Sequence, residues 1–153
     1  MANEIKVSYE SGKTLYFVRR NAAGQVALSD GSVFENWGVG GHDADDYDVG
    51  LTDKSGGLYV GDFDASSNIS TGRCTIQVFL QAGSNPADSD QCVVGGEIIW
   101  TGSGELTPDK VLANKAIQNK STGTIEYYDD DGQTVILTHT PTDSESTLTR
   151  TPS

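Results

Sequence analysis

Residues 57–100 constrain the fold most strongly, because three runs in this stretch alternate apolar and polar side chains with a period of two. The runs cover residues 58–63, 74–80 and 92–100, and two glycines loosen the last of them. A period of two places successive side chains on opposite faces, as in a strand that is half-buried in a sheet. The stretch therefore predicts consecutive β-strands joined by turns.

The two cysteines of the chain lie on either side of the polar segment 82–90, which is rich in turn-forming residues. If the hairpin turns symmetrically about Gly83, Cys74 and Cys92 become neighbours, because each lies nine residues from that glycine. They would form either a cross-strand disulfide or two reduced thiols. We favour reduced thiols, because the N-terminus carries no secretion signal and cross-strand disulfides are strained.

The rest of the first 100 residues also shows short alternating or β-rich runs. They cover residues 5–9, 14–20, 25–28, 32–37 and 47–51, and the pair 25–28 and 32–37 flanks an Asp-Gly turn. Residues 38–46 are acidic and glycine-rich, so we expect a loop there and no helix. Seven or eight short strands with a turn about every ten residues are typical of an all-β, immunoglobulin-like sandwich over residues 1–100.

The sequence changes character after Trp100. Residues 101–106 resemble a linker, and residues 107–153 predict a short helix followed by a C-terminal β-hairpin. Thr107 and Pro108 are a helix-start signal, and good helix formers continue over 110–120 before Gly123. The hairpin is expected over 124–128 and 134–140, and residues 148–151 add a last short strand.

The segment 107–153 carries few large apolar side chains, so its own contacts offset little of the entropy lost on ordering. A short helix and a single hairpin are also marginal by themselves. We therefore expect the segment to pack on a partner chain, in preference to its own sandwich, and to mediate attachment or self-association. The residues predicted to make this interaction are Val111, Leu112, Ile117, Tyr127, Tyr128, Val135 and Leu137.

Composition argues against several other functions. The net charge of −12 repels the phosphates of DNA and RNA. No run of about 18 apolar residues is present to span a membrane. No nucleophile elbow, phosphate-binding loop or zinc-ligand spacing occurs, so the sequence predicts no catalytic, cofactor-binding or metal-binding residues.

Two acidic stretches are candidate metal sites, but neither has the spacing of one. His42 with the nearby aspartates Asp43, Asp45, Asp46 and Asp48 lacks the glycine and closing glutamate of a calcium loop. Residues 129–132 (DDDG) lie between two strand patterns, which favours a hairpin turn over an ion site.

Aromatic side chains offer an alternative function, because a sugar can stack on an exposed ring. The candidates are Trp37, Trp100, Tyr9, Tyr16, Tyr59, Tyr127 and Tyr128. Most of them are in phase with strand alternation, which favours core or cross-strand packing.

Several short segments resemble a family of small proteins encoded by tailed bacteriophages and prophages. The segments are residues 9–16 (YESGKTLY), 57–59 (GLY), 72–78 (GRCTIQV), 81–83 (QAG), 86–90 (PADSD), 96–100 (GEIIW), 114–116 (NKA) and 128–132 (YDDDG). The resemblance covers nearly the whole chain, and its motifs consist of strand and turn residues. It implies a non-enzymatic structural component of the virion, either a capsid decoration protein or a tail-associated fibre or adaptor component.

The resemblance also defines the expected partners and location. The partners are other phage structural proteins and further copies of this chain, with no nucleic acid and no membrane. The protein would be made in the cytoplasm of the host bacterium and incorporated into the virion. The alternative function is a carbohydrate-binding adhesion module on the virion surface, with a cell-surface glycan as its ligand.

Overall fold

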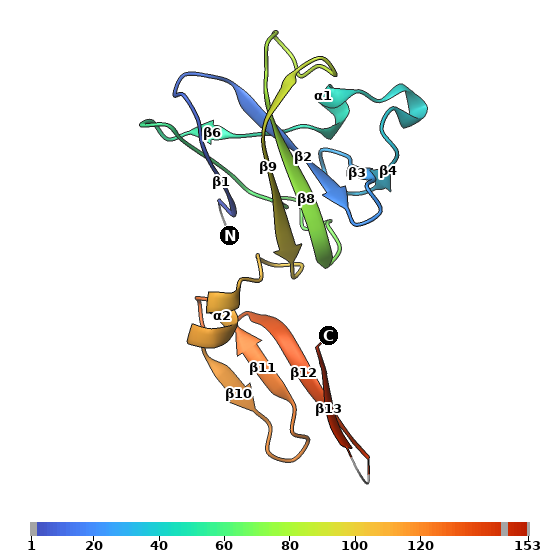
Figure 1. Cartoon of the computed structure of the whole chain (residues 1–153), viewed down its shortest axis with the longest axis vertical. Coiled ribbons are helices and arrows are strands. Elements are labelled where there is room, and N and C mark those ends of the chain that lie inside the picture. The colour runs from blue at the N-terminus through green and yellow to red at the C-terminus, as the bar shows by residue number, and fades with distance from the viewer. Residues whose placement is uncertain (1–2, 145–146, 153) are drawn as a thin grey trace. The chain divides into compact units, whose positions relative to one another are not determined.

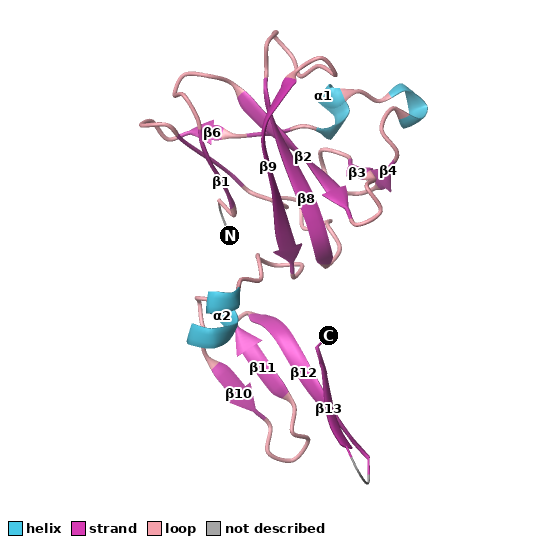
Figure 2. Cartoon of the chain, viewed as in Figure 1, coloured by secondary structure: helices cyan, strands magenta, loops and turns pink. Residues whose placement is uncertain are grey.

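A computed structural model describes residues 3–144 and 147–152 of the chain, with side chains described as far as residue 142. Strands make up most of the regular structure (Figures 1 and 2), which confirms the all-β class. The chain divides into two compact units, Met1–Gly102 and Ser103–Ser153, called here the N-terminal and C-terminal units. Among the described residues, none of the helices has the length and apolar character needed to cross a membrane.

The N-terminal unit contains the strands β1 to β9 and two short helical turns. The elements are β1 (Ile5–Ser8), β2 (Leu15–Asn21), β3 (Val26–Ala27), β4 (Phe34–Glu35), η1 (Val39–Gly41), α1 (Ala44–Tyr47), β5 (Val49–Gly50), β6 (Thr52–Asp53), β7 (Leu58–Gly61), β8 (Gly72–Leu80) and β9 (Gln91–Trp100).

Two antiparallel sheets form from the described strands of this unit. The larger one has the order β4-β3-β2-β8-β9, with β5 pairing on β2, and the smaller one has the order β1-β7-β6. The runs predicted around residues 5–9, 14–20, 58–63, 74–80 and 92–100 all form strands. The immunoglobulin-like assignment stays a prediction.

The main core lies between the two sheets, because buried side chains from both of them belong to one cluster. Ile5 and Tyr59 come from the smaller sheet, and Phe17, Val78 and Ile98 from the larger one. The opposite face of β2 carries a second buried cluster, which includes Tyr16, Val18, Val26, Ala44 and Tyr47. The larger sheet is therefore covered on both faces over part of its length.

The segment 38–46, predicted to be a loop without a helix, contains the start of helix α1. Helix α1 has only four residues, and its N-cap Asp43 accepts a hydrogen bond from Asp45 N while the Asp46 carboxylate accepts one from Asp43 N. These reciprocal bonds stabilise the first turn of a helix. Ala44 and Tyr47 are then buried against the larger sheet, which supplies the packing that a single turn lacks.

The predicted proximity of the two cysteines is wrong. Cys74 pairs with Ile98 on β9, whereas Cys92 pairs with Phe79 on β8. The loop is centred beyond Gly83 because the Asp90 carboxylate accepts hydrogen bonds from Ala82 N and Ala87 N, and a bulge then shifts the register. Both cysteines are free in the structure, with Cys74 buried and Cys92 exposed.

The C-terminal unit contains one helix and a four-stranded antiparallel sheet of order β10-β11-β12-β13 in its described part. The elements are α2 (Pro108–Ala113), β10 (Ala116–Gln118), β11 (Ile125–Tyr128), β12 (Val135–Ser144) and β13 (Thr147–Pro152). The predicted hairpin is present as β11 and β12, and the predicted last strand as β13.

The helix predicted to continue over 110–120 ends much earlier, at Ala113. The Asn114 side chain donates to the Tyr128 carbonyl, and Tyr128 N donates to the Lys115 carbonyl. These bonds draw the chain onto β11, where residues 116–118 form an edge strand in place of further helical turns. Tertiary hydrogen bonds thus override a helix propensity that is only a weak preference.

Candidate functional site

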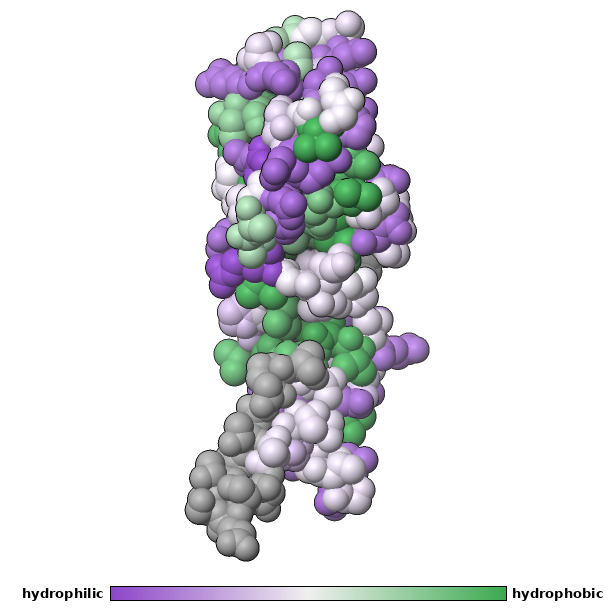
Figure 3. All heavy atoms as spheres, turned by 90° about the vertical axis from the view of Figure 1, so that its right-hand side faces the viewer, coloured by the Kyte–Doolittle hydropathy of each residue, from purple (hydrophilic) through white to green (hydrophobic). Residues whose placement is uncertain are grey.

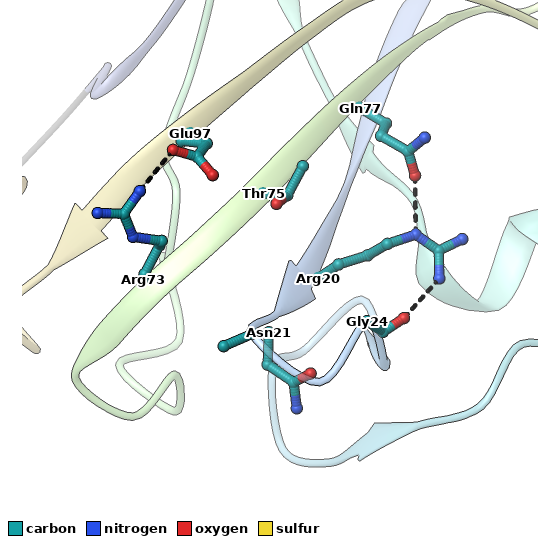
Figure 4. A pocket seen from close by; sticks show the side chains of 8 residues that line it. Arg20, Asn21, Gly24, Arg73, Thr75, Gln77 and Glu97 are labelled. Atoms are coloured by element: carbon teal, nitrogen blue, oxygen red, sulfur yellow. Dashed lines mark hydrogen bonds and ion pairs between the residues drawn. The ribbon is translucent and has the colours of Figure 1, made fainter.

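A polar hollow of about 550 Å³ lies on the outer face of the larger sheet, at the end where β2 stops. Its lining residues are Arg20, Asn21, Ala22, Gly24, Arg73, Thr75, Gln77 and Glu97. Figure 4 shows Thr75 between two hydrogen-bonded pairs, Arg20 with Gln77 and Arg73 with Glu97.

The strand register explains how these residues come together. Arg20, Thr75 and Glu97 occupy one row across three strands, because Arg20 pairs with Thr75 and Thr75 pairs with Glu97. Arg73 and Gln77 lie two residues on either side of Thr75 and point to the same face. A short threonine at the centre of four long side chains leaves the space that forms the hollow.

Arg20 is held in place on three sides. Its Nε donates to the Gln77 Oε1 at 2.7 Å and its Nη1 to the Gly24 carbonyl at 3.0 Å. Its guanidinium carbon lies 5.2 Å from the centre of the Trp37 ring, at the distance of a cation–π contact. Arg20 is therefore oriented before any ligand arrives.

Arg73 and Glu97 form the opposite wall. Arg73 Nη1 and Glu97 Oε2 are 2.7 Å apart, and both side chains are well exposed, at 61% and 59%. An exposed ion pair of this kind contributes only about 0–1 kcal/mol. Either partner can exchange this contact for a ligand at little cost.

The hollow was not predicted from the sequence, although part of the signal is present there. The alternation of residues 74–80 placed Thr75 and Gln77 on one face. The contributions of Arg20 and Glu97 depend on the register of three strands, and the sequence does not specify that register.

The interaction residues predicted in the C-terminal unit differ widely in exposure. Leu112 is 86% exposed, Ile117 43% and Val135 40%, whereas Val111, Tyr127, Tyr128 and Leu137 are half-buried. Figure 3 shows hydrophobic residues, in green, on the surface of the face that it draws. Ile136 is the one large aliphatic residue of the unit that is fully buried among its described side chains.

These residues do not form one patch, because the sheet distributes them over both faces. Tyr127 pairs with Leu137 on one face, and the Tyr127 ring meets His139 edge-on at 5.4 Å. Ile117 pairs with Glu126 on the other face. There it lines a second hollow of about 360 Å³ together with Asn119, Thr122 and Thr124.

A polar network joins the helix of the C-terminal unit to the β11–β12 turn. Lys110 Nζ lies 2.8 Å from Asp129 Oδ1, and both side chains are largely buried. Burial by itself lowers the pKa of Lys110, but the hydrogen bond with Asp129 and the charges of Asp129, Asp130 and Glu105 together raise it. Asn114 donates to Asp130 Oδ1, and the Lys115 ammonium lies 4.3 Å from the centre of the Tyr128 ring.

The acidic DDDG segment lies in the turn between β11 and β12, as predicted. Asp131 accepts hydrogen bonds from Thr134 Oγ1, Thr134 N and Gln133 N, and these bonds lower its pKa to about 2. Among the residues that the structure describes, no group of three or more His, Cys, Asp or Glu side chains is placed to hold a metal ion.

His42 also belongs to a local network. Its Nδ1 lies 2.6 Å from Glu35 Oε1, and the same oxygen accepts a hydrogen bond from the Tyr47 hydroxyl at 2.9 Å. The hydrogen bond with Glu35 raises the pKa of His42, while partial burial opposes it. The network anchors the loop between β4 and α1.

Several of the aromatic side chains considered for sugar stacking lie inside the protein. Tyr16, Tyr59 and Trp100 are buried, and Phe63 packs on Trp100. Trp37 is half-buried, and its Nε1 donates to Asp88 Oδ2.

The chain matches no protein-family model, and neither the curated proteins nor the solved structures contain a significant match to it.

Proposed function

We propose that this protein is a non-enzymatic structural component of a tailed-phage particle, held in its assembly by the C-terminal unit. The observation that carries the proposal is the contrast between Leu112, which is 86% exposed, and the single buried aliphatic residue Ile136 in the described part of that unit. Burying a leucine side chain is worth about 1.5–3 kcal/mol. A partner surface that covers Leu112 would supply the stabilisation that the unit's own core lacks.

The same unit offers a strand edge for association. Strand β10 lies at one end of the sheet order and pairs with β11 alone among the described strands. Edge strands present unpaired backbone groups that can pair with another chain. A further copy of this chain, or another structural protein of the particle, would be the partner.

The resemblance to phage structural proteins supports an attachment role for the C-terminal unit within a virion. Its C-terminal motifs, residues 114–116 and 128–132, contact each other through Asn114, Lys115 and Tyr128. The motifs thus coincide with the contacts that build the proposed attachment unit. Under this proposal the protein is made in the host bacterial cytoplasm and resides in the virion, as a capsid decoration or tail-associated protein.

The test compares the full-length protein with the variant Leu112→Ser and with a version that ends after Gly104. Light scattering measures the assembled mass, and incorporation is measured in particles grown without the native copy. We expect both changes to lower the assembled mass and the incorporation.

The matched control is Val33→Ser, because Val33 is 47% exposed but lies in the N-terminal unit. It should assemble and incorporate as the unchanged protein does. Normal incorporation of the truncated version would show that the N-terminal unit is the attachment element, and the proposal would fail.

A further inference from the structure

In the polar hollow of the N-terminal unit, more hydrogen-bond donors than acceptors are left without a partner. Arg20 uses Nε and Nη1 within the protein, Gln77 uses its Oε1, and Arg73 uses Nη1. Arg20 Nη2, Arg73 Nε and Nη2, and Gln77 Nε2 have no partner among the described residues. The groups left over are mostly donors, so a ligand that fits them must be rich in acceptors.

The charge of the hollow contrasts with that of the whole chain. The net charge is −12 and the sequence has only four arginines, yet two of them line this one hollow. Of the others, Arg19 is buried and Arg150 lies outside the described side chains. The hollow is thus a local concentration of guanidinium groups, the side chains best shaped to hold a carboxylate through two parallel bonds.

The positions of the two arginines suit one small anionic group. Arg20 is opposite Thr75 and Arg73 is two residues along β8, which makes them diagonal neighbours on the sheet with Cα atoms about 7–8 Å apart. Figure 4 shows the two guanidinium groups on opposite sides of Thr75, so both side chains would turn towards an oxyanion bound above this residue. The volume of about 550 Å³ is within the range of small-ligand sites, which is about 300–1,000 Å³.

Glu97 narrows the class of ligand further. Once Arg73 turns to a ligand, the Glu97 carboxylate needs a hydrogen-bond donor beside the bound oxyanion. An acidic peptide side chain carries no hydroxyl group next to its carboxylate that could donate to Glu97. An acidic sugar carries a carboxylate and adjacent hydroxyl groups on one rigid ring, which satisfies the arginines and Glu97 together.

We propose that this hollow binds an acidic sugar of a glycan, with its carboxylate on Arg20 and Arg73 and its hydroxyl groups on Thr75, Gln77 and Glu97. The site lies wholly in the N-terminal unit, so it does not depend on the attachment role proposed for the C-terminal unit. The Trp37 ring contacts the Arg20 guanidinium at the edge of this site. Binding should weaken as salt is added, because the hollow is open to solvent.

The test is an NMR titration of the full-length protein with a trimer of galacturonic acid. Amide shifts are expected on β2, β8 and β9 around Arg20, Thr75 and Glu97. Arg20→Gln and Arg73→Gln should each raise the Kd about tenfold or more, because each removes a charged hydrogen-bond donor. Thr75→Leu should abolish binding by filling the hollow.

The matched control is Lys13→Gln, which removes one charge from another ion pair of the same unit and should change the Kd less than twofold. Thermal melts of all variants show whether the fold is retained, and Arg73→Gln is the safest in this respect because Arg73 is exposed. Three other ligands are titrated in parallel, namely a neutral galactose trimer, inorganic phosphate and triglutamate.

Binding of the acidic trimer alone, with the expected loss in the variants, supports the proposal. Equal binding of the neutral trimer would overturn the role of the carboxylate. If phosphate or triglutamate bound as tightly as the acidic trimer, the site would recognise an anion or an acidic peptide, and the sugar assignment would be wrong. Absence of shifts on these strands with every ligand would also overturn it.

Discussion

The two units of this chain are stabilised by different kinds of contact. The N-terminal unit buries residues on both faces of its larger sheet, including Phe17, Val18, Val26 and Val78, which have no exposed surface. The C-terminal unit buries one large aliphatic residue among its described side chains and relies on polar links such as Lys110 with Asp129. Both units have regular strands, but among the described side chains only the N-terminal unit has a substantial apolar core, so strand pairing does not by itself require one.

The largest expected effect tests the core of the N-terminal unit, where both thiols lie. Cys74 is buried in the main core, and burial raises the pKa of its thiol, whereas Cys92 is exposed. Because a stable domain exposes its core in only about 10⁻³ of molecules or fewer, Cys74 should react with a thiol reagent a thousandfold or more slowly than Cys92. The intact mass of the protein, followed against time without denaturant, measures the rate at which each thiol is labelled.

If a label enters both thiols at similar rates, the N-terminal unit opens far more readily than its core implies. A two-dalton deficit in mass with no labelling would instead reveal a disulfide, which the register of β8 and β9 does not allow.

The next effect compares two core deletions. Phe17→Ala removes a fully buried ring from the main core and should lower the free energy of unfolding of the N-terminal unit by about 3–5 kcal/mol. Ile136→Ala should lower the free energy of unfolding of the C-terminal unit by only about 2 kcal/mol, because no other large aliphatic side chain described in that unit is buried. Trp fluorescence in urea reports on the N-terminal unit alone, since both tryptophans lie there, and hydrogen exchange of 103–142 reports on the other.

Equal costs for the two deletions would show that Ile136 lies in a core as complete as that of Phe17. The contrast between the units would then be wrong.

A smaller effect tests the polar links of the C-terminal unit. Lys110→Met should lower its stability by about 1–2 kcal/mol, because it leaves the buried Asp129 carboxylate without its charged partner. Faster hydrogen exchange in the strands β11 and β12 would measure this. Lys120→Met is the control, since Lys120 is exposed and should change stability by no more than about 0.5 kcal/mol.

The sequence predicted features that depend on local pattern and missed those that depend on register. Alternation located the main strands of the N-terminal unit and the hairpin of β11 and β12. The Cys74–Cys92 contact failed because the Asp90 side chain and a bulge move the turn, and neither leaves a periodic signal. Helix α2 ended early because Asn114 and Lys115 bond to Tyr128, which lies a full strand away.

The same distinction applies to the candidate sites. The exposed Leu112 and Ile117 could be selected from the sequence, because an apolar residue in a segment with little core has few places to be buried. The hollow could not be found in this way, since Arg20, Thr75 and Glu97 come from three strands whose alignment the sequence leaves open. Binding sites that span several strands of a sheet are therefore harder to predict than the strands themselves.

The smallest expected effect is a difference in pH dependence. In the C-terminal unit, hydrogen bonds from Thr134 and Gln133 lower the pKa of Asp131 from 3.8 to about 2. Its stabilising contribution is complete above its unfolded pKa and is lost as the pH falls from 3.8 towards 2. In the N-terminal unit, the hydrogen bond with Glu35 raises the pKa of His42 above 6.5. That contribution is complete below pH 6.5 and is lost as the pH rises through the pKa of the folded state.

A fall in pH from 3.8 towards 2 should therefore loosen the β11–β12 turn, whereas a rise in pH through the folded-state pKa of His42 should loosen the loop around His42 and leave that turn unchanged. Hydrogen exchange of peptides from the two units, corrected for the intrinsic pH dependence, measures both changes. Asp131→Asn should remove the acid effect in the C-terminal unit, whereas Asp45→Asn removes the same charge from the N-terminal unit and should leave it unchanged. If Asp45→Asn removed the acid effect as well, overall charge would be its cause. The hydrogen bonds to Asp131 would then have no special role.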